Sequence, residues 1–151
     1  MKRSGGVGKI GHERWHFLLN AFDHTCLYCG TGGILNLTAD HLVPVRRGGS
    51  TRIWNVVPSC STCNHQKDNK LPLIWLQNLP KVKLREVINR WEQALARIIL
   101  KTPPEYKEWV TKLKVVQTVI LDMVKGIQVR RAKHACTFKP FANLTQRKET
   151  G

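Results

Sequence analysis

Hydrophobic and polar positions alternate with different periods along the first half of the chain. Apolar residues at helical spacing predict a short helix over His12–Phe22. A glycine-rich stretch follows, and apolar residues then alternate with polar ones, as in a half-buried strand, at Leu35, Leu37 and Ala39. We expect a return strand over Ile53–Val57 and a helix near Thr62, capped by Ser61. This half therefore predicts helix, strand, loop, strand and helix.

The second half is helical in pattern. Beyond Pro72 an amphipathic stripe predicts one helix up to the break at Thr102–Pro104, and a second stripe predicts another over about Glu105–Ala132. The two would form a helical hairpin. We expect four parts: a flexible basic leader (1–11), a compact domain (12–72), a helical extension (73–133) and a loose basic tail (134–151).

Charge narrows the range of partners. Lys and Arg number 25 against 10 Asp and Glu, a formal net charge of +15, while hydrophobic residues at 42% suffice for a folded core. Such an excess favours a nucleic acid, because lysines and arginines that neutralise phosphates release condensed counterions. The glycine-rich N-terminus lacks an apolar run typical of a secretory signal, and no stretch predicts a membrane span. We therefore expect an intracellular, cytoplasmic protein.

Four of the five cysteines form two C-x2-C pairs, Cys26 with Cys29 and Cys60 with Cys63. In a reducing compartment such paired knuckles indicate a tetrahedral metal site more often than disulfides, and Zn²⁺ is its usual occupant. A shell of four sulfurs leaves no position for water, so we expect a structural role for this ion.

Between the knuckles lie the groups that a metal-dependent phosphodiesterase needs. Asp40 offers a carboxylate at the end of the predicted strand, His41 a base that titrates near neutrality, and Asn64 a carbonyl oxygen on the following helix. The loop between the strands adds basic residues that we expect to contact phosphates, namely Arg46, Arg47 and Arg52.

This series of motifs resembles the HNH endonuclease family over about Cys26–Lys70, under a third of the chain. The resemblance is carried by the two knuckles and by Ala39-Asp40-His41-Leu42-Val43-Pro44, Gly48-Gly49, Asn55, Pro58, and Asn64-x2-Lys67. It implies an α+β fold: a small ββα-metal (HNH, His-Me finger) core stapled by the four-cysteine zinc site, with the N-terminal helix and the helical hairpin added to it.

The resemblance also implies roles for individual residues. His41 would activate water as the general base, while Asp40 and Asn64 would bind a catalytic Mg²⁺ or Mn²⁺ ion. Asn55 would orient His41 and brace the turn between the strands, and Lys67 would neutralise a phosphate. Asn64 stands where the eponymous members have a histidine, which favours hard cations over softer transition metals. The adjacent His65 is interpreted as an exposed residue that faces away from Asn64, with a role as third ligand left open.

The sequence thus predicts an endonuclease that hydrolyses phosphodiester bonds of double-stranded DNA, by nicking or by cutting both strands. The alternative is a non-catalytic zinc-ribbon module that binds DNA without cutting it, which would have no need for the catalytic trio. Homing, restriction and packaging roles all agree with the resemblance, as do a homodimer and a partner nuclease subunit. RNA ranks well below DNA as a substrate.

Overall fold

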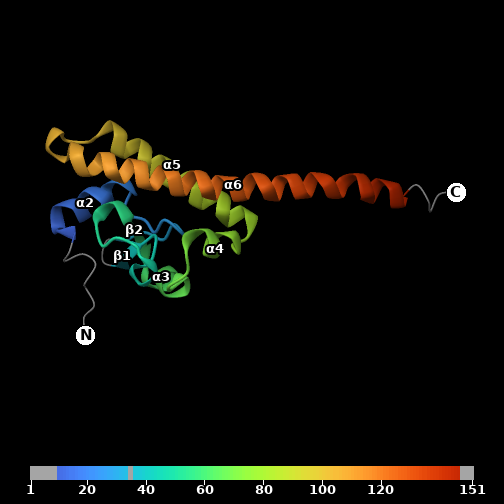
Figure 1. Cartoon of the computed structure of the whole chain (residues 1–151), viewed down its shortest axis with the longest axis horizontal. Coiled ribbons are helices and arrows are strands. Elements are labelled where there is room, and N and C mark those ends of the chain that lie inside the picture. The colour runs from blue at the N-terminus through green and yellow to red at the C-terminus, as the bar shows by residue number, and fades with distance from the viewer. Residues whose placement is uncertain (1–9, 34–35, 147–151) are drawn as a thin grey trace.

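The chain is described here by a computed structural model that covers residues 10–33 and 36–146, with the backbone alone for 132–146. It combines a two-stranded sheet with surrounding helices, which confirms the α+β class (Figure 1). The elements in chain order are α2 (His12–Ala21), β1 (Leu37–His41), β2 (Val56–Cys60), α3 (Ser61–Lys67), α4 (Pro72–Gln77), α5 (Lys81–Leu100) and α6 (Lys107–Gln146), with short 3-10 turns at Val45–Arg47, Ile53–Asn55 and Pro104–Tyr106.

β1 and β2 pair antiparallel, with Leu37 opposite Cys60 and His41 opposite Val56. The return strand therefore begins at Val56, three residues later than the sequence pattern predicts. The reason lies in the preceding turn, where the side-chain amide of Asn55 bonds with the backbone of the connecting loop before strand pairing begins. The later start places Cys60 at the end of the strand.

α3 begins directly after β2. Its N-cap is Cys60 rather than the predicted Ser61, since the Cys60 backbone is still extended and its Sγ accepts a hydrogen bond from the Cys63 amide at 3.4 Å. Strand, cap and helix are therefore continuous, and the second knuckle spans the junction between them.

The helical half differs from the prediction in two places. The single helix expected after Pro72 is divided into α4 and α5, because Pro80 disfavours helical backbone at the residue before it and stands at the N-cap of α5. α6 is longer than expected and continues to Gln146, so the predicted loose tail is helical from 134 to 146. That stretch contains no glycine, and each added residue extends the helix at little cost, although Pro140 removes one hydrogen bond.

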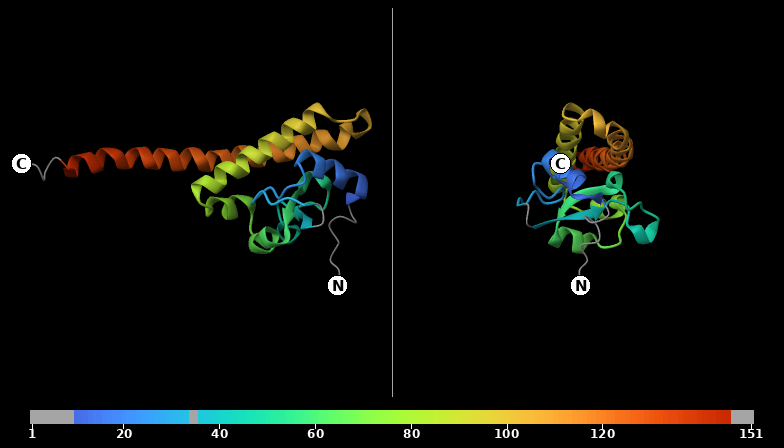
Figure 2. Two further views of the ribbon diagram at one scale, coloured as in Figure 1. Left: turned by 180° about the vertical axis from the view of Figure 1, so that it is seen from behind. Right: turned by 90° about the vertical axis from the view of Figure 1, so that its left-hand side faces the viewer.

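The α5–α6 hairpin lies along one side of the sheet, and α6 extends beyond the rest of the fold (Figures 1 and 2). Buried Gln117 of α6 connects the two layers: its Oε1 accepts from Trp91 Nε1 of α5 at 2.9 Å, and its Nε2 donates to the Val56 carbonyl of β2 at 3.0 Å. The hairpin therefore shares one core with the domain that holds the candidate site.

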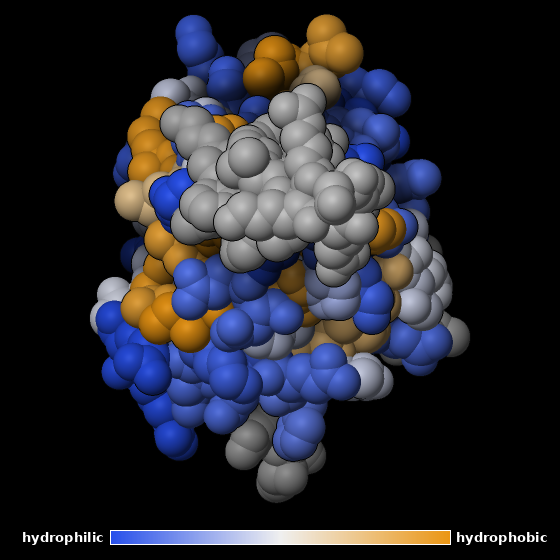
Figure 3. Space-filling model, turned by 90° about the vertical axis from the view of Figure 1, so that its right-hand side faces the viewer, coloured by the Kyte–Doolittle hydropathy of each residue, from blue (hydrophilic) through white to orange (hydrophobic). Residues whose placement is uncertain are grey.

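Residues 1–9 of the predicted leader lie outside the described residues, and Ile10 is buried because its apolar side chain joins the core. Seen from the end toward which α6 points, the bottom of the molecule is mostly hydrophilic, and apolar patches lie at its middle and upper levels (Figure 3). Within the described ranges, no helix has both the length and the apolar character needed to span a membrane.

Candidate active site

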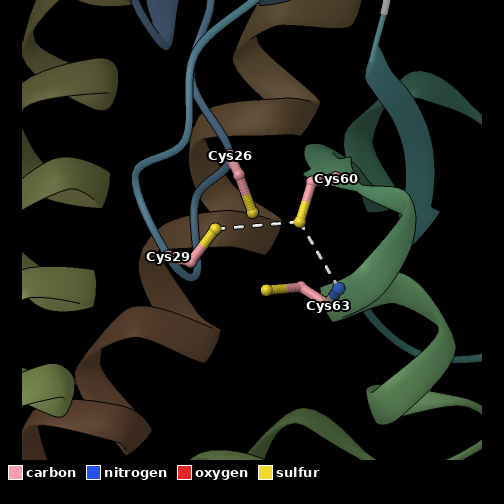
Figure 4. Close-up of side chains that lie close together, drawn as sticks. All are labelled: Cys26, Cys29, Cys60 and Cys63. Carbon is pink, nitrogen blue, oxygen red and sulfur yellow. Dashed lines mark hydrogen bonds between the residues drawn. The ribbon is translucent and has the colours of Figure 1, made fainter.

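The four paired cysteines converge on one point (Figure 4). Cys26 and Cys29 come from the loop after α2, while Cys60 and Cys63 come from the β2–α3 junction, and all four Sγ atoms lie within 4.8 Å of one another. Cys29 Sγ and Cys60 Sγ are 3.7 Å apart. A tetrahedral ion with bonds of about 2.3 Å to sulfur requires a separation of about 3.8 Å. The four sulfurs thus suit a metal ion.

The electrostatics of the cluster differ between its sulfurs. Burial raises the pKa of Cys26 and that of Cys63. Burial also acts to raise the pKa of Cys29, but hydrogen bonds with the side chain and backbone of Thr31 and with the thiols of Cys60 and Cys26 together outweigh it and lower this pKa to about 6. Cys29 is also the exposed member of the set. Its thiolate is therefore the most accessible ligand at neutral pH.

An open cleft of about 490 Å³ lies between the end of β1 and α3. Its lining includes the three residues on which the sequence argument centred: Asp40, His41 and Asn64. Asn64 is oriented by its Nδ2, which donates to Thr38 Oγ1 at 3.1 Å. His65 is exposed, as expected, and it also lines the same cleft, next to Asn64 on α3.

Asp40 is the most constrained residue of the cleft. Its Oδ2 accepts a hydrogen bond from Tyr28 Oη at 2.6 Å, and its Oδ1 lies 3.2 Å from the ammonium nitrogen of Lys67. The residue is 4% exposed. Burial raises the pKa of Asp40, against the lowering effects of Lys67 and the Tyr28 hydrogen bond. Each carboxylate oxygen keeps a further lone pair, so the group is held in place without being saturated.

The structure corrects the role expected of Lys67. Its side chain is 1% exposed, and its Nζ donates both to Asp40 and to the His41 carbonyl, the latter at 2.8 Å. A buried ammonium held in this way is not available to contact a phosphate. Lys67 instead forms an ion pair with Asp40, because a buried ammonium needs an opposite charge to offset its loss of hydration.

Asn55 is buried and braces the loop that connects the strands. Its Nδ2 donates to the carbonyls of Val43 and Ser50, and its Oδ1 accepts from the Val43 amide at 3.0 Å. Gly49 closes the same loop, since a Cβ there would lie 1.8 Å from the Val43 carbonyl oxygen. The predicted bracing role is thus visible in the hydrogen bonds, next to the strand end that carries His41.

The three loop arginines take different positions. Arg46 is exposed and lines the cleft. Arg47 is exposed but its Nε donates to the Asn69 carbonyl, while Arg52 is exposed and is absent from the lining of the cleft. Only Arg46 of the three is therefore placed beside the candidate catalytic residues.

Sequence reasoning missed Tyr28, whose hydroxyl contacts Asp40. The residue lies between the two cysteines of the first knuckle, where attention falls on the sulfurs. Asp68 and Asn69, which also line the cleft, were missed as well. Asp68 has a positive φ of 50° after the last turn of α3. The sequence pattern gives no signal for the Tyr28 contact or for the positions of Asp68 and Asn69. The first depends on how the first knuckle packs against β1, and the second on how α3 does.

Comparisons with known proteins agree with this geometry. The family model for HNH endonuclease matches residues 26–70, which confirms the resemblance for the segment that holds both the cysteine cluster and the cleft. No curated protein matches the chain.

Among solved structures, the chain is similar to the Type II-C Cas9 enzyme from Actinomyces naeslundii, with 32% identity and a TM-score of 0.50. The match covers 69% of this chain and 12% of that enzyme. The chain thus spans about an eighth of its structural neighbour, and the likeness extends beyond residues 26–70.

Proposed function

We propose that this chain is a DNA endonuclease that hydrolyses phosphodiester bonds in the cleft between β1 and α3. One observation carries the proposal: the cleft unites Asp40, His41 and Asn64 within the segment that matches the HNH endonuclease family. A carboxylate, an imidazole and an amide oxygen in one open site supply a general base and hard-cation ligands.

His41 acts as the general base in this proposal. It stands at the last position of β1, half-buried and in the lining of the cleft. An imidazole titrates near neutrality and so accepts a proton from water under working conditions. Asn55 supports this position indirectly, because it fixes Val43, two residues beyond the base.

Asp40 and Asn64 would hold a divalent cation, Mg²⁺ or Mn²⁺. Asp40 keeps unused lone pairs, and Asn64 donates through its Nδ2 and presents its carbonyl oxygen as an acceptor. Both donors are hard oxygens, as these cations prefer. When bound, such an ion supplies positive charge for the scissile phosphate and the leaving oxygen.

Zn²⁺ is the ion we assign to the four cysteines. With zinc bound, the cluster would join the first knuckle to the β2–α3 junction and so stabilise a core whose sheet, in the described residues, has two short strands. Four thiolates complete a tetrahedral shell, which gives the cluster a structural role and leaves hydrolysis to the cleft.

The proposed substrate is double-stranded DNA inside a cell. The net charge of +15 supports a polyanion, and exposed Arg46 at the cleft is our candidate for a phosphate contact. A chain with one such cleft in its described part would nick one strand per encounter. Cutting both strands would then need a second encounter or a second nuclease.

Plasmid cleavage tests this proposal. Purified protein is incubated with supercoiled plasmid in Mg²⁺, in Mn²⁺ and in EDTA, alongside His41→Ala and the matched control His16→Ala, a change at an exposed histidine of α2. We expect open-circular product with either cation, none in EDTA, and loss of activity in His41→Ala only.

The rival outcome is also specific. If the wild-type protein shifts plasmid mobility but leaves the DNA intact at every cation concentration, and His41→Ala shifts it equally, the chain is a binding module. Cleavage that persists in His41→Ala would instead remove the assigned base while keeping the nuclease.

A further inference from the structure

Tyr28 connects the cysteine cluster to the cleft. It lies between Cys26 and Cys29 in the chain, yet its side chain points to the other centre and donates to Asp40 Oδ2 at 2.6 Å. The residue is 4% exposed, and its ring packs edge-on against Trp75 of α4 with centroids 4.6 Å apart. This packing fixes the direction in which the hydroxyl donates.

The backbone of the same knuckle is held from two sides. Arg90 of α5 donates to the carbonyls of Leu27 and Tyr28 at 2.8 and 2.7 Å. The Leu27 amide donates to the Pro58 carbonyl of β2 at 3.0 Å. Tyr28 therefore has a rigid support, which a donor needs if it is to set the orientation of another side chain.

The second donor to Asp40 is tied to the cluster as well. Lys67 stands on α3, one helical turn after Cys63, and its ammonium lies 3.2 Å from Asp40 Oδ1. Each cysteine pair thus carries one donor to the carboxylate: the first pair through Tyr28 and the second through Lys67. Asp40 therefore accepts hydrogen bonds from the two segments whose cysteines meet in the cluster.

We propose that Tyr28 is a positioning residue that orients the Asp40 carboxylate for cation binding and so makes the cleft depend on the intact cysteine cluster. The inference rests on the proposed function, in which Asp40 is a cation ligand. Partners that hydrogen-bond to a metal ligand fix its orientation, and their removal typically weakens metal affinity about 10- to 100-fold. The hydroxyl of Tyr28 is such a partner.

Mn²⁺ binding to the free protein tests the inference without DNA. Electron paramagnetic resonance gives the dissociation constant for wild type, Tyr28→Phe and Asp40→Asn, the last of which identifies the signal from the cleft. The matched control is Tyr106→Phe, since Tyr106 also donates to a carboxylate, that of Glu13, away from the cleft. We expect about tenfold weaker Mn²⁺ binding in Tyr28→Phe and none of this change in Tyr106→Phe.

A merely structural role for Tyr28 would give a different pattern. It would lower the melting temperature and the zinc content of Tyr28→Phe and leave its Mn²⁺ affinity at the wild-type value, which would overturn the inference. Equal Mn²⁺ affinities of wild type and Asp40→Asn would overturn it too, because Asp40 would then not be a ligand of the bound ion. In cleavage assays of Tyr28→Phe we expect a rise in the Mg²⁺ concentration that gives the half-maximal rate. The rate at saturating Mg²⁺ should change less.

A measurement on the unmutated chain covers the case in which Tyr28→Phe does not fold. The protein has two tyrosines, so fluorotyrosine labelling gives two ¹⁹F resonances. Titration with Mg²⁺ should move the Tyr28 signal and leave that of Tyr106 in place. A Tyr28 signal that does not respond contradicts the inference, whereas a response without any plasmid cleavage contradicts the proposed function alone.

Discussion

The cysteine cluster and the cleft are neighbouring polar centres with opposite designs. The cluster is closed: it has four ligands of one type, cysteine sulfurs, which lie within 4.8 Å of one another, and two of the cysteines are buried. The cleft is open, with mixed oxygen and nitrogen groups around about 490 Å³. A closed set holds a fold together, whereas an open one admits water and substrate. Changes at the cluster should therefore affect stability first, and changes in the cleft should affect activity first.

Cys63→Ser should have the largest effect. Serine is a poor zinc ligand, and a metal site of this kind contributes much of the folding free energy of a small domain. We expect loss of bound zinc and of the cooperative unfolding transition, measured by elemental analysis and circular dichroism. Cys136→Ser is the matched control, because its cysteine stands outside the two C-x2-C pairs. A zinc-free Cys63→Ser protein with wild-type stability would contradict the structural role.

Gly49→Ala tests the loop that connects β1 and β2. The added Cβ would lie 1.8 Å from the Val43 carbonyl oxygen, so the backbone that Asn55 braces must move. We expect a loss of about 3 kcal/mol in the free energy of unfolding, measured with urea, together with reduced cleavage. Gly126→Ala is the control, since a Cβ there meets only Arg130, at the ordinary distance of 3.5 Å. Equal stability of the two variants would contradict the role of this loop.

Asn64→Ala removes a proposed cation ligand from the open site. We expect cleavage to fall about 10- to 100-fold at limiting Mg²⁺, with partial recovery at high Mg²⁺ and nearly unchanged stability. Asn89→Ala, at an exposed position on α5, controls for the loss of an amide. If the Mg²⁺ dependence of Asn64→Ala matches that of wild type, Asn64 is not a ligand.

Arg46→Ala should have the smallest effect. Loss of one exposed phosphate contact weakens DNA binding modestly and lowers the slope of log affinity against log salt by about 1. Fluorescence anisotropy at several salt concentrations measures both quantities. Arg85→Ala removes the same charge from an exposed position on α5. It should lower the slope by less than Arg46→Ala does. An identical slope for both variants would mean that only overall charge matters.

The two centres also differ in how far the sequence predicts them. All four cysteines of the cluster follow from the spacing of two C-x2-C pairs, because one residue type at a short fixed interval specifies the ligands. The cleft was predicted in its centre, at Asp40, His41 and Asn64, but not in its surroundings. Mixed groups that meet only through tertiary packing leave no periodic signal.

Lys67 shows the limit of the sequence argument most clearly. A lysine near a nuclease motif is expected at the surface, where it meets phosphates. Its burial depends on the angle at which α3 meets β1, which brings its ammonium to Asp40. Likewise, the sequence predicted a helical hairpin, but not that Gln117 and Arg90 would tie it to β2 and to the first knuckle. Such buried polar contacts join segments far apart in the chain.

The central claim is that hydrolysis takes place at His41, in the cleft rather than at the cluster. Its most direct test is to measure, on one preparation of His41→Ala, the rate of cleavage of a labelled DNA duplex, the zinc content and the free energy of unfolding. The account predicts a rate about 100- to 10,000-fold below wild type, with wild-type zinc and a stability within about 1 kcal/mol. A His41→Ala protein that retains zinc and stability and cleaves at the wild-type rate would contradict it.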